Sequence, residues 1–466
     1  MKTVFNYTLL VAVMLAAATG FAQTQMPPGG KPKDFSLPAS KKMQLSNGFR
    51  AALVPYGNIP KVSIQIVVKT GQVHEGPNEI WLARYTGKLM EEGSTKTDFA
   101  TLSKKVAGMG GHLSISVGME TTTISGAVLS DFAPAFIALM AEVLTQPALP
   151  EAAADRIRSG MKRDLSVRKA QPDAIASEKF FTALYKDHPY GNKMATDEMI
   201  DGYTAQKARE FYTKNYGAQR SAIYVAGNFD EVAVSQAIKT GFGNWTKGPA
   251  VNYPPVKAAT SGDITTIDRP NAAQTVVFIG IPVSDPTSAD YTQLDITNSL
   301  LGGSFGSRIT RNIREDKGYT YSPFSGIQNR QGNGVWYEKA DITSESTADA
   351  LKEIAKEIRG LQSTPPSAEE LKGIQNYEAG SFVLQNSNAD GIISQLTFMD
   401  QYGLKDAYLT NRIRDIYSVT PAQVQGIANK YLNYDKMVLV MVGDKKQLDA
   451  QMDAIKNVKA KVKKPF

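Results

Sequence analysis

The stretch AREFYTKNYGAQRSAIYVAGNFD, residues 208–230, runs from an amphipathic helical pattern through a tyrosine-bearing turn into an apolar strand that ends in glycine. The same order returns in VQGIANKYLNYDKMVLVMVGD, residues 424–444, where Tyr431 takes the place of Tyr216 and the strand again ends in glycine. A helix and strand that recur together indicate an internal duplication of a unit of roughly 200 residues, a plausible size for one domain.

Earlier segments of the two halves correspond in the same way. The strand pattern of residues 62–69 matches that of residues 275–281, in both cases a run of β-branched and apolar side chains. The helical pattern of residues 78–90 likewise matches that of residues 288–301. Strands mixed with paired helices predict an α+β fold with two homologous domains, each a mostly antiparallel sheet with helices packed on one face.

The chain begins with the pattern of a cleaved secretory signal. Lys2 precedes an apolar run, and small residues stand before Gln23. The run is shorter than the roughly 20 residues that span a bilayer, so a membrane anchor is the weaker alternative. We expect an exported protein, with the periplasm as its compartment. The predicted segments are a signal peptide (1–22), a Pro- and Gly-rich tether (23–40), a first domain (41–247), a linker (248–262) and a second domain (263–466).

Composition narrows the class of protein. Of the 466 residues, 42% are hydrophobic and 21% charged, which are ordinary values for a globular chain. The absence of cysteine excludes disulfides and thiolate metal sites. The net charge of +7 comes from Lys and Arg interleaved with acids, which does not favour nucleic-acid binding.

Residues 80–95 (IWLARYTGKLMEEGST) resemble the metal-binding helix of the pitrilysin or insulinase family, whose zinc motif is H-x-x-E-H. In this chain the three motif positions hold Arg84, Gly87 and Lys88. The third zinc ligand of that family, a Glu on a later helix, corresponds here to Asp164. The resemblance therefore implies the family's fold with a degenerate zinc site.

These side chains cannot replace the zinc ligands. Arg and Lys offer donors and no lone pair to a cation, and glycine has no side chain to act as a base. The three histidines of the chain stand in separate segments without ligand spacing: His74, His112 and His188. We expect no metal or other cofactor in this chain. We also expect Asp164 to form an ion pair with Arg84 or Lys88 in place of the metal.

The second half contains a better-preserved signature. Residues 300–322 (LLGGSFGSRITRNIREDKGYTYS) resemble the C-terminal signature of the same family: a Gly-rich turn, a short helix that begins at Ser307, and a strand that carries a tyrosine. The turn lacks the G-x-x-x-x-G-K-[ST] pattern of a phosphate loop. The resemblance assigns Gly302 and Gly303 to substrate binding.

The resemblance also implies roles for Arg314 and Tyr321. In the family an Arg and a Tyr at these positions hold the substrate backbone and stabilise the oxyanion beside the zinc. A local alternative is that Arg314 pairs with Glu315 or Asp316 and that Tyr321 is a core aromatic residue. Earlier in the chain, a Gly-Gly turn leads into an alternating strand that resembles the edge strand to which family substrates add. Its predicted substrate-binding residues are Gly110, Gly111, Leu113 and Ile115.

In two-chain members of the family, such as the mitochondrial processing peptidase, one subunit carries zinc and the other the Arg and Tyr. This chain resembles the second kind. The sequence therefore predicts the non-catalytic subunit of a heterodimeric metallopeptidase, with zinc in a homologous partner and peptides or unfolded proteins as substrates. The alternatives are an inactive structural or assembly protein and a stand-alone peptide-binding protein.

Overall fold

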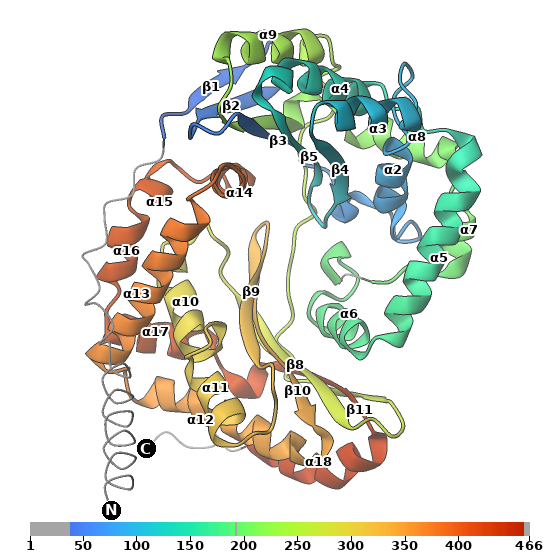
Figure 1. Cartoon of the computed structure of the whole chain (residues 1–466). Helices are drawn as coiled ribbons and strands as arrows, with labels where there is room; N and C mark the ends of the chain where they lie inside the picture. Colours follow the sequence, from blue (N-terminus) through green and yellow to red (C-terminus); the bar gives the residue numbers. More distant parts are fainter. Residues whose placement is uncertain (1–37, 192, 461–466) are drawn as a thin grey trace, which may run out of the picture. The chain divides into compact units, whose positions relative to one another are not determined.

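The computed structural model describes residues 38–191 and 193–460, which form two β-sheets within one compact unit (Figure 1). The predicted signal peptide and residues 23–37 of the tether lie outside the described residues. Among the helices of the described ranges, none combines the length and the apolar character needed to cross a bilayer.

The first sheet has six strands. Their order across the sheet is β1 (Lys41–Gln44), β2 (Arg50–Pro55), β6 (Ser221–Gly227), β3 (Lys61–Val68), β5 (Thr122–Leu129) and β4 (His112–Val117). Only β2 and β6 pair in parallel, and the other neighbours are antiparallel.

The second sheet repeats this topology with five strands. Their order is β7 (Ile264–Asp268), β11 (Val438–Gly443), β8 (Gln274–Val283), β10 (Asn333–Thr343) and β9 (Phe324–Arg330). The pair β7 and β11 is parallel, as is the pair β2 and β6, and the remaining neighbours are antiparallel. Apart from β1, each strand has a counterpart at the same place in the other sheet. The predicted duplication is therefore confirmed in the topology.

Helices follow the same division. Those of the first half are α2 (Leu82–Met90), α3 (Phe99–Gly108), α4 (Ala133–Thr145), α5 (Ala154–Ala170), α6 (Pro172–Tyr185), α7 (Asp197–Asp201), α8 (Ala205–Asn215) and α9 (Glu231–Phe242). Those of the second half are α10 (Tyr291–Asn298), α11 (Arg308–Thr310), α12 (Thr347–Ser363), α13 (Ala368–Gln385), α14 (Ala389–Tyr402), α15 (Ala407–Thr410), α16 (Arg412–Ser418), α17 (Pro421–Tyr431) and α18 (Lys445–Ala460).

Short helical turns join these elements. The 3-10 turns are η1 (Gln72–His74), η2 (Ser130–Phe132), η3 (Glu151–Ala153), η4 (Pro189–Gly191), η5 (Ala218–Arg220), η8 (Ser344–Ser346) and η9 (Tyr434–Lys436), and two π-helical turns are η6 (Ser299–Gly303) and η7 (Arg311–Asp316).

Each sheet buries one face under helices of its own half, as predicted, and its other face under one helix of the other half. In the first half α4 packs on β5 and on α9, on the same side of the sheet in Figure 1. The opposite face receives α14, whose Ile392 and Leu396 pack with β2 and β6 residues such as Ala52 and Tyr224. This exchange joins the two sheets through apolar contacts.

The second sheet receives α6 in the same manner. Phe180 of α6 is fully buried and its ring centroid lies 5.7 Å from that of Phe278 on β8. On β11, Val440 packs against the α6 cluster and Met441 against the helices of the second half. Because both faces are covered, this strand is a continuous apolar run instead of an alternating one.

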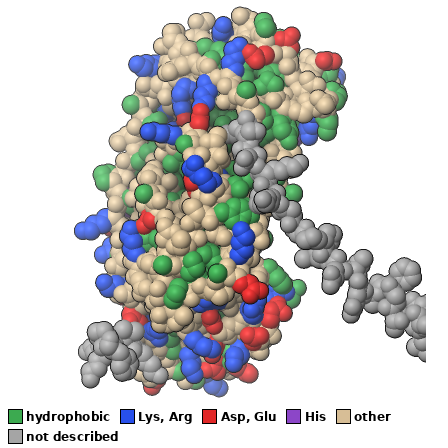
Figure 2. All heavy atoms as spheres, turned by 90° about the vertical axis from the view of Figure 1, so that its left-hand side faces the viewer, with side chains coloured by type: hydrophobic (Ala, Val, Ile, Leu, Met, Phe, Trp, Pro, Cys, Tyr) green, Lys and Arg blue, Asp and Glu red, His purple; other side chains and the backbone are tan. Residues whose placement is uncertain are grey.

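The predicted linker, residues 248–262, forms neither helix nor strand. It packs beside α6, where the Ala259 N–H donates to the Leu184 carbonyl at 2.7 Å and Tyr253 and Val256 join the same apolar cluster. On the face drawn in Figure 2, Lys and Arg side chains are spread among Asp and Glu, as their interleaving in the sequence predicts. The domain boundaries stay predictions.

Candidate functional site

Helix α2, which carries the three zinc-motif positions, begins at Leu82 because a buried carboxylate caps it. Glu75 accepts hydrogen bonds from the Trp81 N–H at 2.9 Å and the Ala83 N–H at 2.8 Å. These donors have no partner inside the helix, so the carboxylate satisfies them. Trp81 has a φ of 75°, which ends the preceding turn and starts the helix four residues later than the sequence predicts.

Gly87 lies where the edge strand β4 meets this helix. A Cβ atom at Gly87 would stand 2.6 Å from Cγ2 of Val117, the last residue of β4. No pair of carbon atoms tolerates that distance without movement. The glycine, which weakens the helix itself, therefore allows the close packing of α2 and β4.

The two cationic positions point to different partners. The guanidinium carbon of Arg84 lies 4.5 Å from the centroid of the Trp81 ring, and that of Arg168 lies 5.8 Å from the same ring. Lys88 is exposed and pairs with Glu91 at 3.0 Å. Arg84 thus forms a cation–π contact where the family has a zinc ligand.

The predicted ion pair of Asp164 with Arg84 or Lys88 is wrong: within the described residues Asp164 has no cationic partner within 4.0 Å. Burial and the charge of Arg168 lower the pKa of Arg84, and Asp164 acts against them through its charge alone. Arg84, Asp164 and Arg168 line a cavity of about 640 Å³. Its two guanidiniums do not fit a divalent cation, and in the part of the chain that the structure describes no three His, Asp or Glu side chains form a metal-binding group.

Arg314 and Tyr321 meet at the surface of the second half. Arg314 belongs to the π-helical turn η7, and its guanidinium carbon lies 4.6 Å from the centroid of the Tyr321 ring and 4.5 Å from that of Phe305. Tyr321 is 78% exposed and Phe305 68% exposed. Tyr321 is therefore not a core aromatic residue. It also precedes β9, so the strand that was predicted to carry it begins three residues later.

The local alternative for Arg314 is realised in part, since its Nε lies 3.1 Å from Glu315 Oε1. This pair is solvent-exposed on the Glu315 side and leaves the guanidinium between the two rings. Ser307 stands at the start of α11 as predicted, although its hydroxyl donates to the Thr310 hydroxyl at 2.9 Å and accepts no capping hydrogen bond from a backbone N–H of this helix.

Gly302 and Gly303 are the last residues of the turn η6, which follows α10 and lies beside the second sheet. A Cβ atom at Gly302 would stand 2.6 Å from Oγ of Ser325 and 2.6 Å from Oε2 of Glu338. Gly302 is buried, so this glycine has a packing role. Its assignment to substrate binding stays a prediction.

The Gly-Gly turn leads into β4, which is the edge strand of the first sheet as predicted. Gly110 has a φ of 66°, a conformation that favours glycine, and Gly111 passes close to the Ala127 carbonyl of β5. Ile115 is buried in the first core and Leu113 packs against it. A peptide added to this edge would therefore contact backbone groups of β4, since these two side chains face the core.

Sequence reasoning missed two parts of this site, Glu75 as the cap of α2 and Phe305 as the second ring on Arg314. A signal for Phe305 was present, because an aromatic residue inside a Gly- and Ser-rich turn has no obvious core to enter. No sequence signal pointed to Glu75, because it accepts hydrogen bonds from the backbone N–H groups of Trp81 and Ala83, and nearly every residue has such a group.

Comparison with known proteins relates these observations to a family. The family described as "Insulinase (Peptidase family M16)" matches residues 51–198, and "Peptidase M16 inactive domain" matches residues 202–377. An uncharacterised zinc protease of Mycobacterium leprae is 23% identical over 435 residues, which cover 90% of this chain and 98% of the relative. Another from Rickettsia bellii is 22% identical over 325 residues, covering 68% of this chain and 78% of the relative.

Two solved structures share the fold. A peptidase M16 inactive domain from Pseudomonas fluorescens has a TM-score of 0.80 and 25% identity, covering 87% of this chain and 98% of its own. A protease from Helicobacter pylori has a TM-score of 0.80 and 18% identity, and the match covers 88% of this chain and 100% of the protease chain. Sequence and fold thus point to one family, whose zinc motif is replaced here by Arg84, Gly87 and Lys88. The chain belongs to peptidase family M16, the insulinase family, as a homologue that lacks the zinc motif.

Proposed function

We propose that this chain is the non-catalytic subunit of a heterodimeric zinc metallopeptidase, paired with a zinc-bearing homologue. The observation that carries the proposal is the contrast between a motif helix that cannot bind zinc and a partly exposed Arg314 beside an exposed Tyr321 in the second half. The substrates are peptides or unfolded segments of proteins. The complex acts outside the cytoplasm, in the periplasm, since the chain begins with a signal-peptide pattern.

Arg314 and Tyr321 serve the partner as hydrogen-bond donors. The rings of Phe305 and Tyr321 hold the guanidinium, so part of its donor geometry is set before a substrate arrives. Donors that are placed in advance stabilise the negative charge that develops on a carbonyl oxygen when water adds to a peptide bond. The partner's zinc would supply that activated water, because Arg84, Gly87 and Lys88 hold no metal.

The edge strand β4 gives the substrate a second anchor. Gly110, Gly111, Leu113 and Ile115 hold an extended peptide through backbone hydrogen bonds, which bind without selecting the side chains. In the second half, Gly302 and Gly303 border the turn that carries Phe305 and bring it near the same substrate.

The test is peptide cleavage by the chain co-expressed with a zinc-bearing homologue from the same genome. We expect Arg314→Ala to lower kcat/KM by about 10²-fold and Tyr321→Phe by about 10-fold, with an intact complex on size exclusion. Arg311→Ala is the matched control, because Arg311 is an exposed arginine of the same π-helical turn. Full activity of both variants would exclude these roles and favour a structural or assembly subunit. Failure of the chain to form a complex with any zinc-bearing homologue, together with peptide binding by the chain, would favour a stand-alone binding protein.

A further inference from the structure

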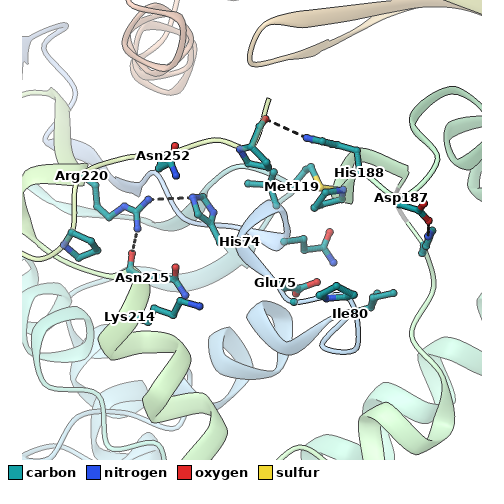
Figure 3. A pocket seen from close by; sticks show the side chains of 18 of the residues that line it. His74, Glu75, Ile80, Met119, Asp187, His188, Lys214, Asn215, Arg220 and Asn252 are labelled. Carbon is teal, nitrogen blue, oxygen red and sulfur yellow. Dashed lines mark hydrogen bonds and ion pairs between the residues drawn. The ribbon is translucent and has the colours of Figure 1, made fainter. Parts of the chain in front are cut away.

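A cavity of about 750 Å³ lies between the segment after β3, the turn η4, the end of α8 and the predicted linker (Figure 3). This volume is typical of a small-molecule site. The linker forms part of its wall, where the Pro254 carbonyl lies 3.3 Å from Nε2 of His188. The cavity shares Gln72 and Lys193 with the neighbouring one around Arg84 and includes none of the residues used in the proposed function.

One arginine in the cavity wall is buried without a counter-ion. Arg220 is 2% exposed, its Nη1 donates to the Asn215 carbonyl at 2.6 Å, and its Nη2 lies 3.2 Å from Nε2 of His74. Its Nε has no hydrogen-bond partner, and no carboxylate of the described residues lies within 4.0 Å of the guanidinium. Burying a charged group costs free energy unless an opposite charge pairs with it. An anion bound at this guanidinium would therefore be stabilised.

The hydrogen bond to the Asn215 carbonyl accounts for only part of the stabilisation of this buried positive charge. It places a cation at the C-terminal end of α8, where carbonyl groups favour positive charge. His74 cannot supply the missing charge, because burial and the charge of Arg220 lower its pKa to about 4 and leave it neutral. Among the described residues Nε of Arg220 therefore has no acceptor.

Other charges around the cavity add to the positive balance. Lys214 lies exposed at its margin, on the last turn of α8. Burial raises the pKa of Glu75 to about 8, so that carboxyl group is mostly neutral near pH 7. Asp187 is exposed and pairs with Lys193 at 3.5 Å. The rest of the wall is largely apolar and includes Val73, Ile80 and Met119.

We propose that this cavity binds a molecule with one carboxylate on an apolar body, with the carboxylate at Arg220 and the body against Val73, Ile80 and Met119. Two sources share this chemistry, a small free acid and the C-terminal residue of a peptide. The inference stands apart from the proposed heterodimer, since none of its residues takes part there.

The first experiment is isothermal titration of the full chain with N-acetylleucine and with N-acetylleucinamide, which differ only in the charge of the end group. We expect N-acetylleucine to bind and the amide to bind at least about tenfold more weakly, because a charged hydrogen bond is lost. Equal affinity of the two probes, or no binding of either, would overturn the proposal.

Variants locate the binding. Arg220→Gln should weaken N-acetylleucine at least about tenfold. Because that change also removes the contact with α8, Met119→Trp provides a second test by filling the cavity from the turn between β4 and β5, and it should abolish binding. Lys239→Ala, an exposed lysine of α9, is the control and should bind like the wild type. Unchanged binding by folded Met119→Trp would place the probe elsewhere and refute the site.

A longer peptide that ends in leucine distinguishes the two sources. If the Kd of this peptide is within about tenfold of that of N-acetylleucine, and the same peptide with an amidated C-terminus does not bind, the ligand is a peptide C-terminus. If only N-acetylleucine binds, the ligand is a small acid. Either result supports the cavity as a carboxylate site.

Discussion

Gly87 shows how one absent side chain fits an inactive motif into this fold. In the zinc-binding members of the family a glutamate stands at this position, and here Val117 of β4 occupies the space that even a Cβ atom would need. The close packing of α2 against β4 thus depends on the glycine that replaces the motif glutamate. Restoring H-x-x-E-H at residues 84, 87 and 88 would require the side chain of Val117 to move.

We expect Gly87→Ala to lower the free energy of unfolding, although alanine favours a helix interior by about 1 kcal/mol. The collision with Val117 costs about 1–3 kcal/mol, as overpacking does in other cores. Urea unfolding measures the difference. Val117→Ala in the same chain should recover most of it, and a stabilised Gly87→Ala single variant would contradict this packing.

Glu75 makes stability depend on pH. Burial raises its pKa to about 8 from an ordinary 4.5, against hydrogen bonds from Ala83 and Trp81 that favour the carboxylate. Between these values the folded protein holds more protons than the unfolded chain, so its stability falls as pH rises. We expect the wild type to lose more stability than Glu75→Gln between about pH 5 and about pH 8 in urea unfolding. Parallel curves would show that Glu75 is already ionised in the folded protein at pH 5.

At the scale of the elements, α6 and α14 each cover the sheet of the other half. Their apolar residues pack on sheets that are formed by the other half of the chain, such as Phe180 with Phe278 and Leu396 with Tyr224. The stability of each sheet therefore depends on both halves of the chain.

Phe180→Ala tests this dependence. The side chain is fully buried, so its removal should cost about 3–5 kcal/mol of unfolding free energy. Hydrogen exchange should speed up in β8 and β11, which lie in the other half. Phe99→Ala is the matched control, since Phe99 is 55% exposed and its removal should change stability by less than about 0.5 kcal/mol. Faster exchange confined to the first half would contradict the exchange of helices.

For the molecule as a whole, two carboxylates join the halves beside the apolar contacts. Asp400 of α14 accepts from Nη2 of Arg50 at 2.9 Å and lies 3.5 Å from Nζ of Lys69. Glu120 accepts from the Gln331 N–H at 2.7 Å and from Nε2 of Gln401 at 2.8 Å. Both carboxylates therefore contribute to the orientation of the two sheets within the unit.

We expect Asp400→Asn to lower the free energy of unfolding by about 1–3 kcal/mol at neutral pH, because two largely buried cations lose their partner. Burial raises the pKa of Asp400, but Arg50 and Lys69 lower it by more, so the net shift is downward. This contribution is present above the ordinary value of 3.8 and is lost as pH falls through the lowered folded value. The free energies of unfolding of the wild type and of Asp400→Asn should therefore become equal at acidic pH. Asp406→Asn, whose carboxylate is exposed beside Lys42, should match the wild type within about 0.5 kcal/mol.

The sequence by itself determined the duplication, the strand and helix types and the loss of the zinc ligands, because hydrophobic period, turn residues and side-chain chemistry are local properties. The first hairpin is an example: an Asn-Gly pair, a sequence signal for a tight turn, stands between β1 and β2, and Gly48 has a positive φ of 91°. The identities of Arg84 and Lys88 likewise excluded zinc binding at these positions, because both side chains are cationic donors without a lone pair for a metal.

Only the tertiary structure decided which distant segments meet. It showed why residue 87 is glycine, which helix covers each sheet, and that Phe305 completes the aromatic contact of Arg314. His74 and Arg220, separated by 146 positions, meet in one cavity. Such contacts depend on how whole elements dock, and docking is chosen by the shape and burial of surfaces that no local pattern describes.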